Sequence, residues 1–164
     1  MHDIALASTA DLDSITALLQ ANAPSQGGTL TGEFPRDKVA RMMAAGMPVV
    51  VAHRDGQVVG VLFSGPRNDP AAPPPVQAMW AAWPGSPGAY VYGPVCIADS
   101  ERGQGLLPRL YAALQTHCPG CEAVLFIRRD NAISLRAHLR LGMQEVAGYT
   151  LDSVDYAVLT SATG

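Results

Sequence analysis

The stretch that most constrains this chain covers residues 90–115, YVYGPVCIADSERGQGLLPRLYAALQ. An apolar run, expected as a strand, passes through a glycine-rich turn directly into an amphipathic segment, expected as a helix. The backbone N–H groups of Gly103–Leu106 are predicted to be unpaired donors in the first turn of that helix, where the helix dipole favours an anion. Gly103 and Gly105 lack Cβ atoms, so a ligand can approach the main chain closely, and Arg102 adds a cation. The stretch therefore predicts a phosphate-binding turn.

Length, charge and hydropathy limit the class of protein. The 164 residues are expected to form one domain, residues 1–164, with a sizeable core. The apolar runs are short, and the N-terminus lacks the basic start and apolar core of a signal peptide. The net charge of −3 comes without a basic run, which argues against nucleic acid as a partner. We therefore expect a cytoplasmic protein that binds neither a membrane nor nucleic acid.

The three cysteines do not indicate a disulfide framework, because their number is odd. Cys118 and Cys121 have the spacing of a redox pair, but they follow a predicted helix, whose dipole would raise the pKa of a thiol there. A zinc site would need further ligands, and no second cluster supplies them. No metal site is predicted.

Apolar periodicity and turn residues predict the remaining elements. Strands are expected at residues 3–7, 48–53, 58–65, 89–97, 122–128, 146–150 and 154–160, and helices after Ser8 or Thr9, from Pro35, after the glycine-rich turn, and after Asp130 or Asn131. The dipeptide Asp55-Gly56 predicts a tight antiparallel hairpin. The proline-rich insertion at residues 67–88 is expected to be a functional loop, because a disordered segment seldom carries two tryptophans.

Two familiar nucleotide-binding motifs do not fit the turn. A P-loop requires Lys followed by Ser or Thr after its last glycine, whereas this chain has Leu106 and Leu107. A dinucleotide-binding turn requires a third glycine where Pro108 stands and an acidic residue at the end of the next strand, whereas Glu122 lies at the start of its strand. Both motifs are therefore excluded.

The turn resembles a motif of the GNAT superfamily of N-acetyltransferases, R/Q-x-x-G-x-G/A. The segment Ser100–Gly105, SERGQG, matches both glycines, with Ser100 in place of the leading Arg or Gln. A second segment, Asn131–Met143, NAISLRAHLRLGM, resembles the downstream GNAT motif N-x-x-S/A-x-x-x-Y/H-x-x-x-G-F, with Met143 in place of Phe. The order of the expected elements agrees as well, so the resemblance covers essentially the whole chain.

The resemblance implies an α/β (α+β) fold and a ligand. The fold would be a mixed, mostly antiparallel sheet of six to seven strands, splayed between the fourth and fifth strands, with about four helices. The anion would be the pyrophosphate of acetyl-CoA, the co-substrate, and its pantetheine arm would lie in the splay. The residues that would bind coenzyme A are Val95, Cys96, Ile97, Arg102, Gly103, Gln104, Gly105, Leu106, Leu107, Asn131 and Ser134.

Acetyl transfer to an amine requires a neutral amine, a polarised thioester carbonyl and a proton for the departing thiolate. The resemblance places His138 near the sulfur, where a histidine of near-neutral pKa could protonate the thiolate. Alternatively, His138 only packs or bonds a backbone carbonyl. Tyr90 and Tyr92 share one face of their strand, and they either act on the amine through water or belong to the core.

The acceptor site is less constrained by the sequence. Glu33, Asp37 and Asp69 are candidates for holding a cationic amine, with solvated surface charges as the alternative. Trp80 and Trp83 would either wall the acceptor site or anchor their loop. We expect an enzyme that acetylates a primary amine of a small molecule by direct attack in a ternary complex.

A second hypothesis is an acyl-CoA-binding or regulatory module without turnover. It is motivated by the lack of an obvious glutamate base on the fourth strand and by Ser100 at the position of the motif's Arg or Gln. Relatives often form dimers, so a homodimer is also considered.

Overall fold

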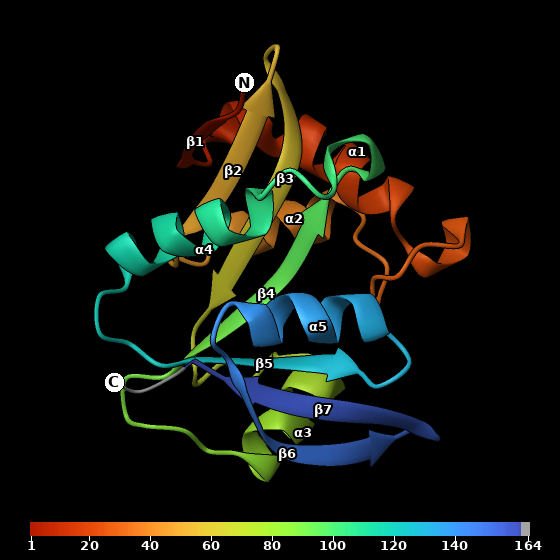
Figure 1. Cartoon of the computed structure of the whole chain (residues 1–164), viewed down its shortest axis with the longest axis vertical. Coiled ribbons are helices and arrows are strands. Elements are labelled where there is room, and N and C mark those ends of the chain that lie inside the picture. Colours follow the sequence, from red (N-terminus) through yellow and green to blue (C-terminus); the bar gives the residue numbers. More distant parts are fainter. Residues whose placement is uncertain (162–164) are drawn as a thin grey trace. The chain divides into compact units, whose positions relative to one another are not determined.

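The computed structural model of the chain describes residues 1–161. In these residues the strands form a mixed sheet, and helices pack on it (Figure 1). The strands are β1 (Asp3–Leu6), β2 (Val49–Arg54), β3 (Gln57–Gly65), β4 (Tyr90–Ile97), β5 (Ala123–Arg128), β6 (Gln144–Leu151) and β7 (Val154–Thr160). The α-helices are α1 (Leu12–Ala21), α2 (Arg36–Met43), α3 (Pro74–Ala82), α4 (Leu106–His117) and α5 (Ala132–Arg140). None of these helices is both long and apolar enough to cross a membrane.

The seven strands are ordered β1-β2-β3-β4-β5-β7-β6. The pairs β1–β2, β2–β3, β5–β7 and β6–β7 are antiparallel, whereas β4 and β5 are parallel. The β4–β5 ladder joins Tyr90 to Ala123 and Val91 to Val124, although β4 continues to Ile97 and β5 to Arg128. This short ladder confirms the predicted mixed sheet, splayed between its fourth and fifth strands.

The chain forms two compact units, of which the first consists of residues 1–65 and 92–120. Its main core lies where α1 and α2 meet alternate residues of the sheet, such as Val51 on β2 and Phe63 on β3. The alternate residues of these strands that point to the opposite face of the sheet lie towards α4. A Cβ on Gly60 of β3, for example, would lie 3.3 Å from the Leu110 side chain of α4. Both faces of β2 and β3 are therefore covered by helices.

The second unit consists of residues 66–91 and 121–161. Its core forms where α3 packs on the sheet, with Met79 fully buried against Val124 of β5 and Val158 of β7. This helix lies within the insertion that was predicted as a loop, and it makes five α-helices in the described residues instead of the predicted four. The prolines mislead because Pro73 precedes the helix and Pro74 occupies its first turn, where a missing N–H group costs nothing.

Other local predictions agree with the structure. Asp55 and Gly56 have φ values of 53° and 78°, as a two-residue turn between twisted antiparallel strands requires. The β6–β7 pair is antiparallel, and α5 begins directly after Asn131, whose side chain accepts a hydrogen bond from the Ser134 N–H at 3.2 Å.

Candidate active site

The predicted phosphate-binding turn has an unusual backbone conformation. Gly103 and Gly105 have φ values of 77° and 75°, a left-handed region that glycine adopts without strain. Gly105 is the N-cap of α4, which begins at Leu106. The prediction that all four residues Gly103–Leu106 lie in the first helical turn is therefore wrong for the first three, because they precede α4 in a separate turn that the positive φ values of Gly103 and Gly105 make possible.

The turn nevertheless presents donors to open space. Within residues 1–161, no protein acceptor takes the backbone N–H groups of Gly103, Gln104, Gly105 or Leu106. A Cβ atom built on either glycine would meet no atom within 4 Å. Successive unpaired N–H groups next to a helix N-terminus bind anions, and the open space leaves room for one.

Arg102, next to the turn, is held by three oxygens. Its Nη1 lies 2.8 Å from the Asp99 carboxylate, its Nε donates to the Ile97 carbonyl at 3.3 Å, and its Nη2 donates to Asn22 Oδ1 at 3.3 Å. The Arg102–Asp99 pair is largely exposed to water, so it contributes little stability. Arg102 can therefore exchange Asp99 for a ligand phosphate at little cost.

A buried carboxylate lies in a cluster that contacts the turn, and it was not predicted from the sequence. Glu101 is 7% exposed, and its Oε1 lies 2.6 Å from His2 Nε2 and 2.7 Å from Arg54 Nε. The hydrogen bond from His2, followed by that from Arg54, holds the pKa of Glu101 below its ordinary value. Arg54 also donates to Gln104 Oε1 at 3.5 Å, so the same cluster contacts the turn itself. An acidic residue two positions before the first glycine was the available sequence signal.

The predicted coenzyme-binding residues of β4 differ in their surroundings. Cys96 is buried towards α1, with its sulfur 3.9 Å from the Leu18 carbonyl oxygen, and burial raises the pKa of its thiol to about 12. Val95 and Ile97 are only half-buried, and Ile97 lies on the α4 side, next to Gly60. Cys96 is therefore a core thiol, whereas its two neighbours retain partly accessible side chains.

Helix α5 brings Asn131, Ser134 and His138 onto one face. His138 is 2% exposed, and its Nδ1 lies 2.8 Å from the Ser134 carbonyl oxygen. Because a carbonyl can only accept, Nδ1 carries the proton. Burial lowers the pKa of His138 below 6.5, so its imidazole is neutral at pH 7. The bond to a backbone carbonyl is the arrangement considered above as the alternative to a catalytic role.

Comparison with known proteins decides the family. Residues 14–143 match the sequence profile of the acetyltransferase (GNAT) family. The chain belongs to this family.

Solved GNAT structures share this fold at low sequence identity. A phosphinothricin acetyltransferase from Sinorhizobium meliloti in complex with acetyl-CoA is 19% identical, with a TM-score of 0.73 over 97% of this chain and 86% of that one. A ribosomal-protein-alanine N-acetyltransferase from Brucella melitensis is 21% identical, with a TM-score of 0.72 over 97% of this chain and 98% of that one. A search of curated protein sequences found no match.

In this GNAT chain, most of the residues predicted for the acceptor site have structural partners. Glu33 accepts hydrogen bonds from the Ser25 hydroxyl at 2.6 Å and the Ser25 N–H at 3.2 Å, which closes the loop between α1 and α2. Asp37 pairs with Arg41 at 3.2 Å, and Asp69 accepts from the Ala71 N–H at 2.9 Å. These three carboxylates are thus engaged within their own segments.

The two tryptophans play different parts. Trp83 Nε1 donates to Glu122 Oε2 at 2.9 Å, so Trp83 anchors the insertion, which is one of the two roles considered for it. Trp80 belongs to α3, and the Arg67 guanidinium lies 5.4 Å from its ring centre.

The two tyrosines of β4 are buried. Tyr90 pairs with Ala123 in the ladder, and Tyr92 meets Tyr111 edge to face at 5.7 Å. Each is therefore part of the core of its own unit.

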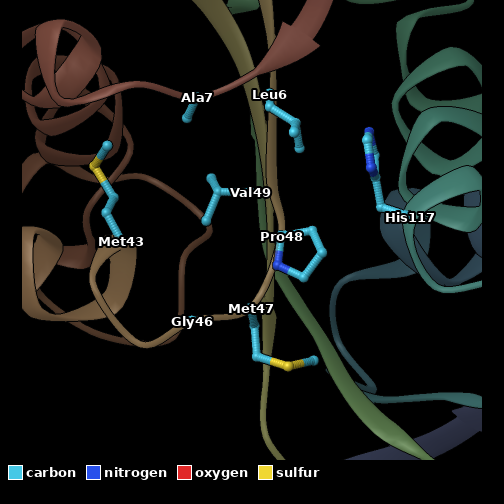
Figure 2. A pocket seen from close by; sticks show the side chains of 8 residues that line it. All are labelled: Leu6, Ala7, Met43, Gly46, Met47, Pro48, Val49 and His117. Atoms are coloured by element: carbon cyan, nitrogen blue, oxygen red, sulfur yellow. The ribbon is translucent and has the colours of Figure 1, made fainter.

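Neither a metal centre nor a cavity in the first unit adds to the site. Among residues 1–161, no three His, Cys, Asp or Glu side chains are grouped so as to hold a metal ion. Cys118 and Cys121 directly follow α4, at its C-terminal end. A cavity of about 310 Å³ in the first unit is lined by Leu6, Ala7, Met43, Gly46, Met47, Pro48, Val49 and His117 (Figure 2). No residue predicted for the site lines it.

Proposed function

We propose that this chain is an acetyl-CoA-dependent N-acetyltransferase that acetylates a primary amine of a small molecule by direct attack in a ternary complex. The observation that carries the proposal is the turn before α4. Four of its backbone N–H groups have no acceptor within residues 1–161, its two glycines adjoin open space, and Arg102 lies next to it. Acetyl-CoA fits this turn because its pyrophosphate offers the oxygens that such donors bind. The acetyl-CoA complex of the Sinorhizobium relative supports the assignment of the ligand.

Three side chains are proposed to assist the chemistry. The amine nitrogen forms a bond to the thioester carbon, the carbon–sulfur bond breaks, the amine loses a proton and the thiolate gains one. His138, Tyr92 and Tyr90 are the candidates for these proton transfers. Because burial lowers the pKa of His138, its imidazole has no extra proton to give at pH 7, whereas the thiolate needs a donor.

The turn can be tested with two matched glycine variants. Gly105→Ala places a Cβ on a residue with φ of 75°, and Gly46→Ala does the same at 83°, in each case with no atom within 4 Å. Both should cost about 1–2 kcal/mol of backbone strain. We expect only Gly105→Ala to weaken acetyl-CoA binding, by at least tenfold in calorimetry. Equal acetyl-CoA affinities in the two variants would show that the turn is not the coenzyme site.

The acceptor class and turnover need an activity screen. A panel of small primary amines, together with a peptide that begins with alanine, would be tested for release of coenzyme A thiol. The peptide is included because the Brucella relative is a ribosomal-protein-alanine N-acetyltransferase. Acetyl-CoA binding without thiol release across the panel would favour the second hypothesis, an acyl-CoA-binding or regulatory module.

The role of His138 has its own test. We expect His138→Ala to lower the turnover rate more than the affinity for acetyl-CoA. A proton acceptor would make the rate of the parent enzyme fall as the pH drops through the pKa of His138, whereas a proton donor would make it rise. Unchanged turnover in the variant would assign His138 a packing role only.

A further inference from the structure

Arg67 is a half-buried cation without a counter-ion. It follows β3, and its side chain is half-buried in the second unit. The two other half-buried arginines in the described residues, Arg54 and Arg128, pair with Glu101 and Asp130. Arg67 pairs with no carboxylate in residues 1–161. A guanidinium without a carboxylate partner is available to pair with an anion that a ligand supplies.

The hydrogen bonds of Arg67 leave one edge of its guanidinium available. Nε and Nη2 both donate to the Pro84 carbonyl, at 3.1 Å and 2.7 Å. No acceptor in the described part of the chain takes Nη1. The bonds to Pro84 hold the plane of the guanidinium in place, so its other edge is preorganised for a planar anion.

Trp80, whose ring is next to Arg67, has a second donor without a partner. Its ring lies under the Arg67 guanidinium, 5.4 Å from centre to centre, and its indole N–H is the only buried side-chain donor or acceptor in residues 1–161 without a partner. Buried polar groups are almost always paired, and an unpaired one costs about 1–3 kcal/mol. Trp83, three residues later, shows the ordinary arrangement, because Glu122 accepts its N–H.

We propose that Arg67 and Trp80 form a subsite for a carboxylate carried by the acceptor amine. A carboxylate is planar and accepts from several donors at once, so it can pair with the Nη1 edge of Arg67 and satisfy the Trp80 N–H on entering. The proposal rests on the proposed function and narrows its substrate to amino acids and related amino carboxylates.

The test compares each amino acid with its amide, which keeps the amine and the side chain but loses the negative charge. We expect kcat/KM of the parent enzyme to be at least tenfold higher for the acid. Trp80→Phe keeps an aromatic ring next to Arg67 and removes the N–H together with part of the ring system, as Trp83→Phe does at its own position, so it should reduce that ratio at least fivefold. Trp83→Phe is the matched control, and it should leave the ratio unchanged.

Three outcomes would overturn the subsite. These are equal rates for acids and amides, a ratio that Trp80→Phe does not change, and an equal loss in the two variants. Turnover of uncharged amines alone would refute the subsite while upholding acetyl transfer. If no amine is acetylated, calorimetry of an amino acid against its amide still decides the matter, because the subsite requires tighter binding of the acid and loss of that preference in Trp80→Phe.

Discussion

Glu122 is predicted to be a major determinant of stability in the second unit. It is 6% exposed, and it accepts hydrogen bonds from Trp83 Nε1 at 2.9 Å, from the Ser86 N–H at 2.7 Å and from the Thr160 hydroxyl. No cation in residues 1–161 pairs with it, so these donors alone compensate its charge. We expect Glu122→Gln to destabilise the protein strongly, although the two side chains have nearly the same shape.

The size of the effect follows from counting donors. Glutamine offers one oxygen in place of two, and its NH₂ group must face at least one of the three donors. A hydrogen bond to a charged group contributes about 1.5–3 kcal/mol, and a buried donor left unpaired costs about 1–3 kcal/mol. We therefore expect a loss of about 3 kcal/mol in the free energy of unfolding. For a chain of this length, that lowers Tm by roughly 6–12 °C.

The effect should also depend on pH. Burial alone would raise the pKa of Glu122, but the hydrogen bonds from Thr160, Trp83 and Ser86 outweigh it and hold the pKa below its ordinary value of 4.5. A carboxylate with a lowered pKa stabilises the folded protein above the unfolded pKa and loses that contribution as the pH falls. The difference between parent and variant should therefore be full at pH 7 and shrink below about pH 4.5.

Urea unfolding followed by tryptophan fluorescence measures both quantities. Glu145→Gln is the matched control, because Glu145 forms an exposed pair with Arg129 at 3.1 Å and its loss should cost at most about 1 kcal/mol. The reasoning is refuted if Glu122→Gln costs no more than this control at pH 7. It also fails if the difference stays constant between pH 7 and pH 3.5.

Three further predictions concern single side chains. Asn131→Ala should lower the free energy of unfolding by about 1 kcal/mol in urea titrations, because it removes the cap of α5, and an unchanged midpoint would contradict this. Cys96 should resist alkylation at pH 8 in the native protein and react only after unfolding, as mass spectrometry of labelled peptides would show, since burial raises its pKa to about 12. Stability should fall as the pH drops below about 6.5, because unfolded His138 takes up a proton more readily than the buried imidazole, and His138→Gln should reduce this slope in unfolding titrations.

Local features of this protein could be predicted from the sequence because they depend on neighbouring residues. The Asp55-Gly56 turn, the glycine-rich turn before α4 and the Asn131 cap each need only the conformational freedom or hydrogen-bonding capacity of a few adjacent residues. The order of these features along the chain was also enough to suggest the GNAT family, which the match over residues 14–143 establishes.

Helix α3 shows where such local reasoning fails. Its prolines indicate a loop, whereas tertiary contacts such as the burial of Met79 against β5 and β7 favour a helix there. Propensity is a weak guide where tertiary packing decides the outcome.

The partners of the polar side chains were decided by tertiary structure alone. His2 meets Glu101 across 99 positions, and Trp83 meets Glu122 across 39, so no local pattern reveals either pair. The same holds for the difference between Trp83 and Trp80, which have similar sequence surroundings but different hydrogen bonding. The sequence alone determined where the chain turns and which segment can cradle a phosphate. Folding determined which charges are buried and which donors remain for a substrate, because burial and pairing depend on residues that are far apart in the chain.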